Sequence, residues 1–400
     1  MWAASLVGGP VNDQTRICRK PQASGWCSAS SWECTGREAD WRFEAYEMDV
    51  KVHTQLPQSS GNRHGAVTDS HGRALHDLRI SVTDRCNLRC RYCMPKELFG
   101  ASYKFMPTTQ LLTFEEIARV TRCLVELGVE KVRLTGGEPL VRHNLEDLVA
   151  RISGLGAVDI AVTTNGVLLT EEKAYALKQA GLQRITVSLD TLEPDVFRFM
   201  SGSKVQPERI LRAIDAAAAA GLDPVKINMV VQRGVNEESI LPMAEHFRGT
   251  RHILRFIEFM DVGTTNGWLL KDVVTAGEIR QLIDNRWPLE PLPRRYPGEV
   301  AQRFRYRDGG GDIGIIASVT QPFCRACTRL RLTADGKFYT CLFAPVGHDL
   351  RAALRTGISD NEIRDGVAKL WSGRSDRYSE LRARSGNTLS GRAEMWQIGG

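Results

Sequence analysis

Three cysteines stand close together in the first quarter of the chain. Cys86, Cys90 and Cys93 have the spacing C-x3-C-x2-C and follow directly on the apolar stretch 78–82. Cysteine is the usual protein ligand of iron–sulfur clusters, and four thiolates would complete a 4Fe–4S cube. Three thiolates leave one iron open, and an open coordination position distinguishes reactive metal sites from structural ones. The loop therefore predicts a four-iron cluster with a free coordination site.

Two other interpretations of these cysteines are weaker. A zinc site would need four nitrogen or sulfur ligands, commonly as two C-x2-C pairs. A disulfide framework suits small secreted domains rather than a chain of 400 residues. The aromatic Tyr92 before the third cysteine, and the apolar strand expected before the first, favour a cluster over a chance grouping.

A second set of three cysteines lies far downstream, with Cys324 and Cys327 as a C-x2-C pair followed by Cys341. A structural zinc ion with a distal histidine such as His348 would fit these residues. Two independent sets of three cysteines favour instead a second iron–sulfur cluster that also has an open iron. We carry both interpretations forward and favour the second cluster.

Composition restricts the class of protein. Lys and Arg exceed Asp and Glu by only 53 to 47, which favours a small anionic substrate over nucleic acid, where a clustered basic face is expected. No run of about 18 or more apolar residues occurs, so no membrane span is expected. Ten cysteines without a secretory signal predict a reducing cytoplasm.

From residue 78 onward, apolar β-rich runs alternate with helical patterns. This alternation predicts parallel strands joined by right-handed crossovers. Six such units are too few for a closed barrel of eight, so we expect an α/β fold with a partial (β/α)6 TIM-type barrel, whose sites lie at the carboxyl ends of the strands. Strands are expected at 78–83, 129–135, 158–163, 182–189, 223–231 and 252–259, and helices at 113–127, 144–153, 170–180, 207–220 and 236–248.

The chain is expected to divide into three parts. Residues 1–74 lack periodicity and are either a disordered extension or a start upstream of a true initiator, Met48. Residues 75–261 would form the barrel. Residues 262–400 would form a C-terminal α+β domain whose cysteines cap the open side of the barrel.

Several strand ends carry polar residues. Gly136 and Gly137 permit close backbone approach to a ligand, and Glu138 offers an acceptor for an amino group. If the strand-borne cations point inward, they suit a polyphosphate, because guanidinium forks bind phosphate oxygens bidentately. These cations are Arg79, Arg133, Lys226, Arg255 and the pair Arg329 and Arg331 on one face of an extended segment.

The cysteine spacing with Tyr92 resembles the radical S-adenosylmethionine (radical SAM) superfamily. More specifically, the chain from about residue 69 onward resembles the GTP 3′,8-cyclase family of molybdenum-cofactor biosynthesis. The segments that carry this resemblance are 77–95, 131–139, 163–166, 187–190, 225–234, 255–263, 266–268, 298–301, 323–331, 335–344 and 398–400.

The resemblance implies a lyase that converts GTP to 3′,8-cyclo-7,8-dihydro-GTP by means of a 5′-deoxyadenosyl radical. Its cofactors would be SAM and two 4Fe–4S clusters, one on each cysteine set, with the second cluster facing guanine. The terminal Gly399 and Gly400 would insert toward the active site. SAM would lie against Tyr92, Gly137, Ser188 and Met260, and GTP would contact Arg79, Arg133, Thr163, Lys226, Arg255, Arg329, Leu330 and Arg331.

The resemblance also implies partners. These are an electron donor of the flavodoxin or ferredoxin type and a coupling to cyclic pyranopterin monophosphate synthase, while monomer and homodimer both remain open. Two other functions are alternatives to this one. A peptide-modifying radical SAM maturase typically has more than three C-terminal cysteines and need not carry the basic segment 328–331. A zinc-stabilised binding protein would be colourless rather than brown.

Overall fold

The computed structural model describes residues 67–296, 298–385 and 392–399. Most of the expected N-terminal extension and Gly400 therefore lie outside the described residues. Residues 67–74, which the sequence assigned to that extension, are folded: Thr68 and Ala74 form an antiparallel bridge, and the side chains of Asp69 and Arg73 are buried. The extension as predicted is therefore too long at its C-terminal end.

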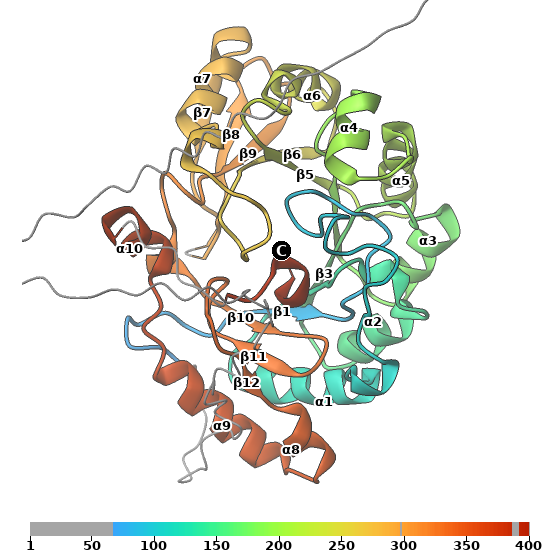
Figure 1. Ribbon diagram of the computed structural model, residues 1–400, viewed down its shortest axis with the longest axis vertical. Helices are drawn as coiled ribbons and strands as arrows, with labels where there is room; N and C mark the ends of the chain where they lie inside the picture. The colour runs from blue at the N-terminus through green and yellow to red at the C-terminus, as the bar shows by residue number, and fades with distance from the viewer. Residues whose placement is uncertain (1–66, 297, 386–391, 400) are drawn as a thin grey trace, which may run out of the picture. The chain divides into compact units, whose positions relative to one another are not determined.

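The six strand–helix units predicted from the sequence are present (Figure 1). Neighbouring strands are parallel throughout, as expected. The strands are β1 (Asp77–Ser81), β2 (Lys131–Thr135), β3 (Asp159–Thr164), β4 (Arg184–Ser188), β5 (Lys226–Val231) and β6 (Ile253–Glu258). The helices are α1 (Phe114–Val125), α2 (Leu145–Ser153), α3 (Glu171–Gln179), α5 (Pro207–Ala219), α6 (Ile240–Phe247) and the unpredicted α4 (Pro194–Ser201).

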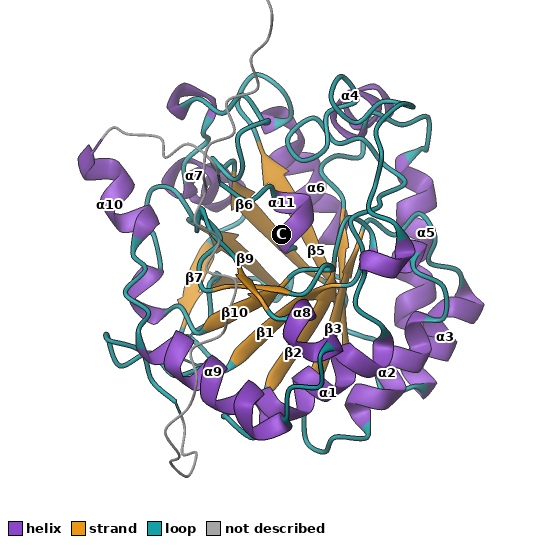
Figure 2. Cartoon of the chain, turned by 60° about the horizontal axis from the view of Figure 1, so that its bottom comes forward, coloured by secondary structure: helices purple, strands orange, loops and turns teal. Residues whose placement is uncertain are grey.

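Helix α1 shows why these segments become helices. Thr113 caps its N-terminus by accepting a hydrogen bond from the backbone nitrogen of Glu116, whose carboxylate accepts one from the backbone nitrogen of Thr113. The apolar side chains at helical spacing, Ile117, Val120 and Leu124, are fully buried. The helices thus cover the outside of the strands (Figure 2).

The C-terminal region extends the barrel sheet at both edges. The strand order is β12-β11-β10-β1-β2-β3-β4-β5-β6-β9-β8-β7. Strand β10 pairs in parallel with β1, and β9 pairs in parallel with β6. The added elements are α7 (Ala276–Arg286), β7 (Leu289–Leu292), β8 (Gln302–Tyr306), β9 (Asp312–Ile316), β10 (Arg329–Leu332), β11 (Lys337–Tyr339), β12 (His348–Asp349), α8 (Arg351–Arg355), α9 (Asp360–Ser372), α10 (Tyr378–Ser385) and α11 (Met395–Ile398).

This arrangement bears on the expected domains. The described residues all belong to one compact unit, 51–400, and the region after residue 261 builds on the barrel sheet rather than on a sheet of its own. The α/β class and the partial barrel are confirmed, while the boundary at 261/262 stays a prediction. No helix in the described part of the chain is long and apolar enough to cross a membrane.

Strand alternation and register place the interior side chains. Leu78 and Ile80 of β1 are fully buried in the core under the helices, so Arg79 between them points to the opposite face. Arg79 is in register with Arg133 of β2 and with Arg331 of β10. Three arginines on neighbouring strands therefore lie at the same level inside the barrel.

Candidate active site

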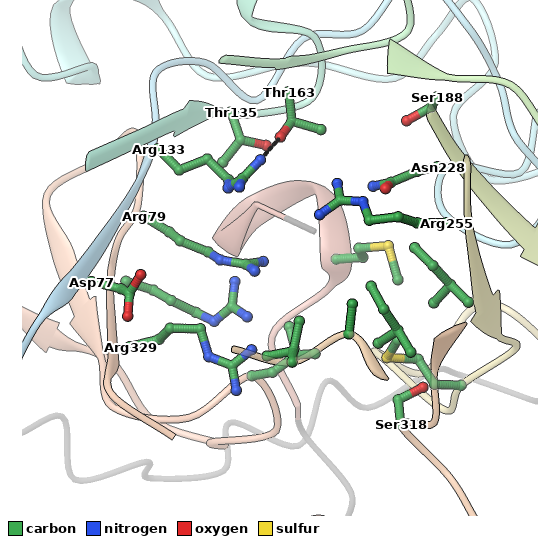
Figure 3. A pocket seen from close by; sticks show the side chains of 18 of the residues that line it. Asp77, Arg79, Arg133, Thr135, Thr163, Ser188, Asn228, Arg255, Ser318 and Arg329 are labelled. Atoms are coloured by element: carbon green, nitrogen blue, oxygen red, sulfur yellow. Dashed lines mark hydrogen bonds between the residues drawn. The ribbon is translucent and has the colours of Figure 1, made fainter. Parts of the chain in front are cut away.

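A cavity of about 550 Å³ occupies the interior of the barrel. Both cysteine sets line it, together with every SAM and GTP residue implied by the resemblance except Leu330. Figure 3 shows the guanidinium ends of Arg79, Arg133, Arg255 and Arg329 directed into this space. The structure thus brings together residues that are up to 262 positions apart in the sequence, from Arg79 to Cys341.

The first cysteine loop leaves the carboxyl end of β1 and is held against the turn after β2. The backbone nitrogen of Gly137 donates to the carbonyl of Thr83 at 2.8 Å, and that of Glu138 donates to the carbonyl of Arg85 at 2.8 Å. A Cβ at Gly137 would overlap the backbone of Arg85. Glycine is therefore required there for the two segments to approach.

The environment of the first three thiols suits a metal-bound thiolate. The backbone nitrogen of Leu88 and the amide Nδ2 of Asn165 point at the sulfur of Cys86, at 3.4 and 3.8 Å. Burial raises the pKa of Cys86 to about 11 and also raises the pKa of Cys90 and of Cys93. These thiols would therefore stay protonated unless a cationic centre, such as cluster iron, replaced their protons.

Three of the residues expected against SAM, Tyr92, Ser188 and Met260, lie at the rim that carries the first cysteine loop. The hydroxyl of Tyr92 donates to Asp190 at 2.8 Å and so ties the cysteine loop to the end of β4. Burial raises the pKa of Asp190 to about 6. Ser188 ends β4 and Met260 follows β6, so both lie at the same rim as the loop.

Glu138 lines the cavity and also joins the turns after β2 and β3. Its side chain is buried, and its carboxylate accepts hydrogen bonds from the backbone nitrogens of Leu140 (3.0 Å) and Asn165 (2.7 Å) and from the hydroxyl of Thr164 (2.7 Å). Burial raises its pKa to about 7. These three donors leave about one of the four acceptor positions of the carboxylate unfilled. Glu138 therefore holds two strand-end turns together, and its role as an acceptor for an amino group stays a prediction.

The second cysteine set lines the same cavity from β10 and β11. Arg329 donates to the sulfur of Cys327 at 3.2 Å, and the backbone nitrogen of Phe343 donates to that of Cys341 at 3.5 Å. Burial alone would raise the pKa of Cys327, but the charges of Arg329 and Arg374 outweigh it and lower the pKa to about 6. This thiol is therefore held as a thiolate, the form that binds iron or zinc.

The described cysteines do not converge on a single metal ion. Among the described residues, no three His, Cys, Asp or Glu side chains lie close enough together to hold one metal ion. In an iron–sulfur cluster each cysteine binds a different iron, so its ligands need not converge on one point. Both the zinc interpretation with His348 and the second cluster stay predictions.

The interior cations lack acidic partners. Within the part of the chain that the structure describes, none of Arg79, Arg133, Lys226 and Arg255 is ion-paired with a carboxylate. Burial, with the neighbouring cations adding to it, lowers the pKa of Arg79 and of Arg133 to about 9, that of Arg255 to about 10 and that of Lys226 to about 7. Buried charges without partners are costly, so the cavity is suited to a polyanion.

Hydroxyl groups orient two of these cations. Arg133 donates from one nitrogen to the hydroxyls of Thr163 (2.7 Å) and Thr186 (3.2 Å), and Arg255 donates to Thr186 at 3.3 Å. Arg255 keeps a buried Nε without a partner. Thr163 therefore positions Arg133, and both guanidinium groups keep further donors for a ligand.

Leu330 is the one predicted ligand whose side chain does not reach the cavity. Arg329 and Arg331 line the cavity, whereas Leu330 between them is fully buried in the core on the other face of β10. Its side chain points away because successive side chains of a strand point to opposite faces, and a contact of GTP with Leu330 stays a prediction.

The C-terminal tail enters the barrel. Helix α11 lies inside the ring of strands (Figures 1 and 2), and Arg331 donates to the carbonyls of Ile398, at 3.0 Å, and Gly399. Gly399 has a φ of 68°, and a Cβ on it would overlap the side chain of Thr135. Glycine is therefore required at the point where the tail passes β2.

Other lining residues were not singled out from the sequence. Asn228 follows Lys226 by two positions on β5, and its Oδ1 is buried without a partner. The ammonium of Lys131 lies 3.2 Å from the centre of the Tyr296 ring at the opposite end of β2 from the cysteine loop. The alternation of side chains along β5 and β2 predicts that Asn228 and Lys131 face the cavity with Lys226 and Arg133. Tyr296 lies in a loop, where no such periodicity exists.

Two family models match the chain: the radical SAM superfamily over residues 80–247, and Molybdenum Cofactor Synthesis C over residues 252–380. A GTP 3′,8-cyclase of Acidothermus cellulolyticus is 55% identical over 322 residues, which cover 79% of this chain and 89% of that protein. One from Xanthomonas axonopodis pv. citri is 51% identical, covering 84% and 99%. Streptococcus suis SuiB is only 17% identical over 79% of this chain and 69% of SuiB, and its TM-score of 0.51 shows the fold alone. The chain therefore belongs to the radical SAM GTP 3′,8-cyclase family.

Proposed function

We propose that this protein converts GTP to 3′,8-cyclo-7,8-dihydro-GTP, the first step of molybdenum cofactor biosynthesis. The observation that carries the proposal is the placement of the cysteine sets. Cys86 follows the carboxyl end of β1, whereas Cys327 precedes the amino end of β10, which is parallel to β1. The two sets therefore lie toward opposite ends of one cavity, with unpaired cations between them.

Membership in the radical SAM superfamily implies SAM and a 4Fe–4S cluster as cofactors. When bound, they supply a 5′-deoxyadenosyl radical that takes the ribose 3′ hydrogen of GTP, after which C3′ bonds to guanine C8 and the adduct is reduced. We propose that Cys86, Cys90 and Cys93 hold this cluster. SAM would then lie against Tyr92, Gly137, Ser188 and Met260, which line the same end of the cavity.

We propose that the chain contributes mainly by positioning GTP. Arg79, Arg133, Lys226 and Arg255 would hold the triphosphate, and Arg329 would lie between it and the second cysteine set. Thr163 would act on GTP indirectly, by orienting Arg133, which donates a hydrogen bond to it. Arg331 would contact GTP while it also holds the C-terminal tail. Such orientation of reacting groups can lower a barrier by about 7–11 kcal/mol.

The second cysteine set is proposed to hold a second 4Fe–4S cluster whose open iron faces the guanine ring. Two features support this assignment. Cys324, Cys327 and Cys341 all face the cavity rather than the core, and Cys327 is held as a thiolate by neighbouring arginines. A zinc ion would give a colourless second site, so iron content and absorption near about 400 nm separate the two assignments.

The partners are proposals of the same kind. An electron donor of the flavodoxin or ferredoxin type would reduce the protein, in a reducing compartment such as the cytoplasm. The product would pass to cyclic pyranopterin monophosphate synthase, and a homodimer is carried as one oligomeric state to test. Retention of the synthase on the immobilised protein only when product is present would support the transfer, and no association under any condition would refute it.

The test of the activity is an anaerobic reaction of the reconstituted protein with SAM, dithionite and GTP, followed by mass spectrometry. Deoxyadenosine together with an isomer of GTP of unchanged mass is the expected result. Formation of deoxyadenosine without conversion of GTP would refute GTP as the substrate but would still support radical cleavage of SAM. ATP serves as the matched control, because it carries the same triphosphate on a different base.

A further inference from the structure

A buried group of charged side chains lies behind the second cysteine set, and one of its members also lines the cavity. It consists of Asp69, Arg73 and Arg374, whose side chains are exposed by 0%, 3% and 1%. The carboxylate of Asp69 accepts from Arg73 at 2.6 Å and from Arg374 at 3.1 Å. Arg374 lines the cavity, whereas Asp69 and Arg73 do not. None of the three is among the GTP contacts proposed above.

The two arginines donate hydrogen bonds to backbone carbonyls at, or next to, each of the three cysteines. Arg73 donates to the carbonyl of Cys324 at 2.7 Å. Arg374 donates to the carbonyl of Cys327 at 2.7 Å and to that of Thr340, the residue before Cys341, at 3.0 Å. One carboxylate therefore joins two guanidinium groups, and these fasten the two separate segments that carry the cysteines.

Apolar packing contributes little to holding the cysteines themselves. Cys324 lies in a single turn of 3-10 helix, Cys324–Ala326, which contributes no buried residue. None of the three cysteines belongs to the main hydrophobic core. Charge-assisted hydrogen bonds from rigid guanidinium forks are stronger and more directional than neutral ones, so these contacts fix the carbonyls.

The arginines are themselves held in place by their surroundings. Arg374 follows helix α9 and lies over the ring of Trp371, 4.5 Å from its centre. The indole of Trp371 donates to the carbonyl of Arg73 at 2.9 Å. The carboxylate of Asp69 also accepts from the backbone nitrogens of His71 and Arg73, both at 2.9 Å. The turn at residues 69–73 is thereby locked onto α9.

We infer that Asp69, Arg73 and Arg374 are positioning residues that hold the second cysteine set in the arrangement needed for its cluster and set the charge around it. This inference rests on the proposed second cluster. Partners that orient metal ligands from behind typically affect metal affinity about 10–100-fold. The two guanidinium groups face the carboxylates of Asp69 and, at 3.3 Å from Arg374, of Asp376, and local charge is one determinant of cluster reduction potential.

The test uses the full chain with the three cysteines of the first set replaced by alanine, so that bound iron reports on the second set. After reconstitution, the rate of iron loss to a chelator is measured. We expect Arg374→Gln to lose iron about 10–100-fold faster than the parent. Arg119→Gln is the matched control, because it breaks an Arg–Asp pair with Asp360 away from both cysteine sets. Equal rates in Arg374→Gln and Arg119→Gln would overturn the inference.

The reduction potential separates this role from a merely structural one. Removing a negative charge in Asp69→Asn should raise the potential, and removing a positive charge in Arg374→Gln should lower it. Arg374→Lys keeps the charge but loses the fork, so its potential should stay near that of the parent while iron is lost faster. Shifts in the same direction for Asp69→Asn and Arg374→Gln would overturn the charge argument.

Two controls keep the outcomes distinct. In the chain with all cysteines present, the absorbance of the first cluster and SAM binding should be unchanged by Arg374→Lys, which shows that the barrel is folded. Cys324→Ala in the alanine background should abolish iron binding. If the chain that carries only the three alanine substitutions of the first set binds no iron, the proposed second cluster is refuted and the inference fails with it. If iron binds but is insensitive to Arg374, only the inference fails.

Discussion

We expect Lys226 to make the affinity for GTP depend on pH, because its pKa is lower than the pKa values of Arg79, Arg133 and Arg255. Burial, followed by the charges of Arg255, Arg184, Arg133 and Arg295, lowers its pKa to about 7. The ammonium is therefore half deprotonated near pH 7 in the free protein. A bound triphosphate favours the charged form and should restore the pKa toward its ordinary value of about 10.4.

The magnitude follows from the fraction of protein that is already charged. Between about pH 7 and about pH 8.5 the protonated fraction of a group with a pKa of 7 falls from about one half to about 3%, so the affinity should fall about 15-fold, or about 1.6 kcal/mol. Arg79, Arg133 and Arg255 titrate at higher pH, with pKa values of about 9 to 10. The window therefore isolates Lys226 among these cations.

Stability of the ligand-free protein should change in the opposite direction. An unfolded chain keeps the Lys226 side chain protonated up to about pH 10.4, whereas the folded chain releases that proton near pH 7. Since the unfolded state binds more protons in this interval, the free energy of unfolding gains a contribution that rises with pH. As the pH rises from about 7 to about 8.5, we therefore expect the affinity for GTP to fall while the contribution of Lys226 to the free energy of unfolding rises.

The assay is anaerobic calorimetry of GTP binding to the cluster-loaded protein, in two buffers of different ionisation enthalpy. Near pH 8.5 the binding of each GTP should take up about one proton. Lys226→Met should bind more weakly at pH 7 and lose most of the dependence on pH, whereas the exposed Lys204→Met should behave like the parent. Proton uptake and pH dependence that are unchanged in Lys226→Met would refute the reasoning.

Other predictions concern single side chains. Arg133→Ala should weaken GTP binding about 10–100-fold through loss of charge-assisted hydrogen bonds without changing SAM affinity; unchanged GTP affinity in calorimetry would mean that Arg133 does not contact phosphate. Cys324→Ala should leave SAM cleavage partly intact and abolish cyclisation, and mass spectrometry that still detects the cyclic product would contradict this. Leu330→Ala should lower the free energy of unfolding by about 2–5 kcal/mol, measured with denaturant, while leaving GTP affinity unchanged. Glu138→Gln should impair SAM cleavage, because an amide nitrogen would face protein donors at a cost of about 1–3 kcal/mol; wild-type cleavage would refute that role.

The strands and helices of the barrel could be predicted because their determinants are local. Period-two apolar patterns, capping boxes and glycine stops lie within each segment, as in the helix that begins after Thr113. The pairing of β10 with β1 could not be predicted in this way. It joins Arg329 to Asp77 across 252 residues, and a strand of 4 residues carries too little pattern to identify its neighbour.

The same distinction applies to the site. Cysteine spacing and strand-borne cations are sequence signals, and the cations do face one cavity. The direction of Glu138 depends on which donors surround it after folding, and those donors come from the end of β3. Asp69 and Arg73 lie in a polar stretch without periodicity, and their significance depends on Arg374, about 300 residues later. Side-chain roles set by distant partners have no local signature.

The register of β10 against β1 decides whether the site exists. Leu330 and Leu332 are fully buried in the core, in register with Leu78 and Ile80. A slip of one residue would expose these leucines to the cavity and turn both Arg329 and Arg331 into the core, because side chains alternate along a strand. The apolar pattern therefore fixes the cations as well as the core. It also fixes the distance between the cysteine sets, since one strand begins two residues after Cys327 and its parallel neighbour runs toward Cys86. The five residues of β1 span about 16 Å, and a strand of this length lies between the two cysteine sets.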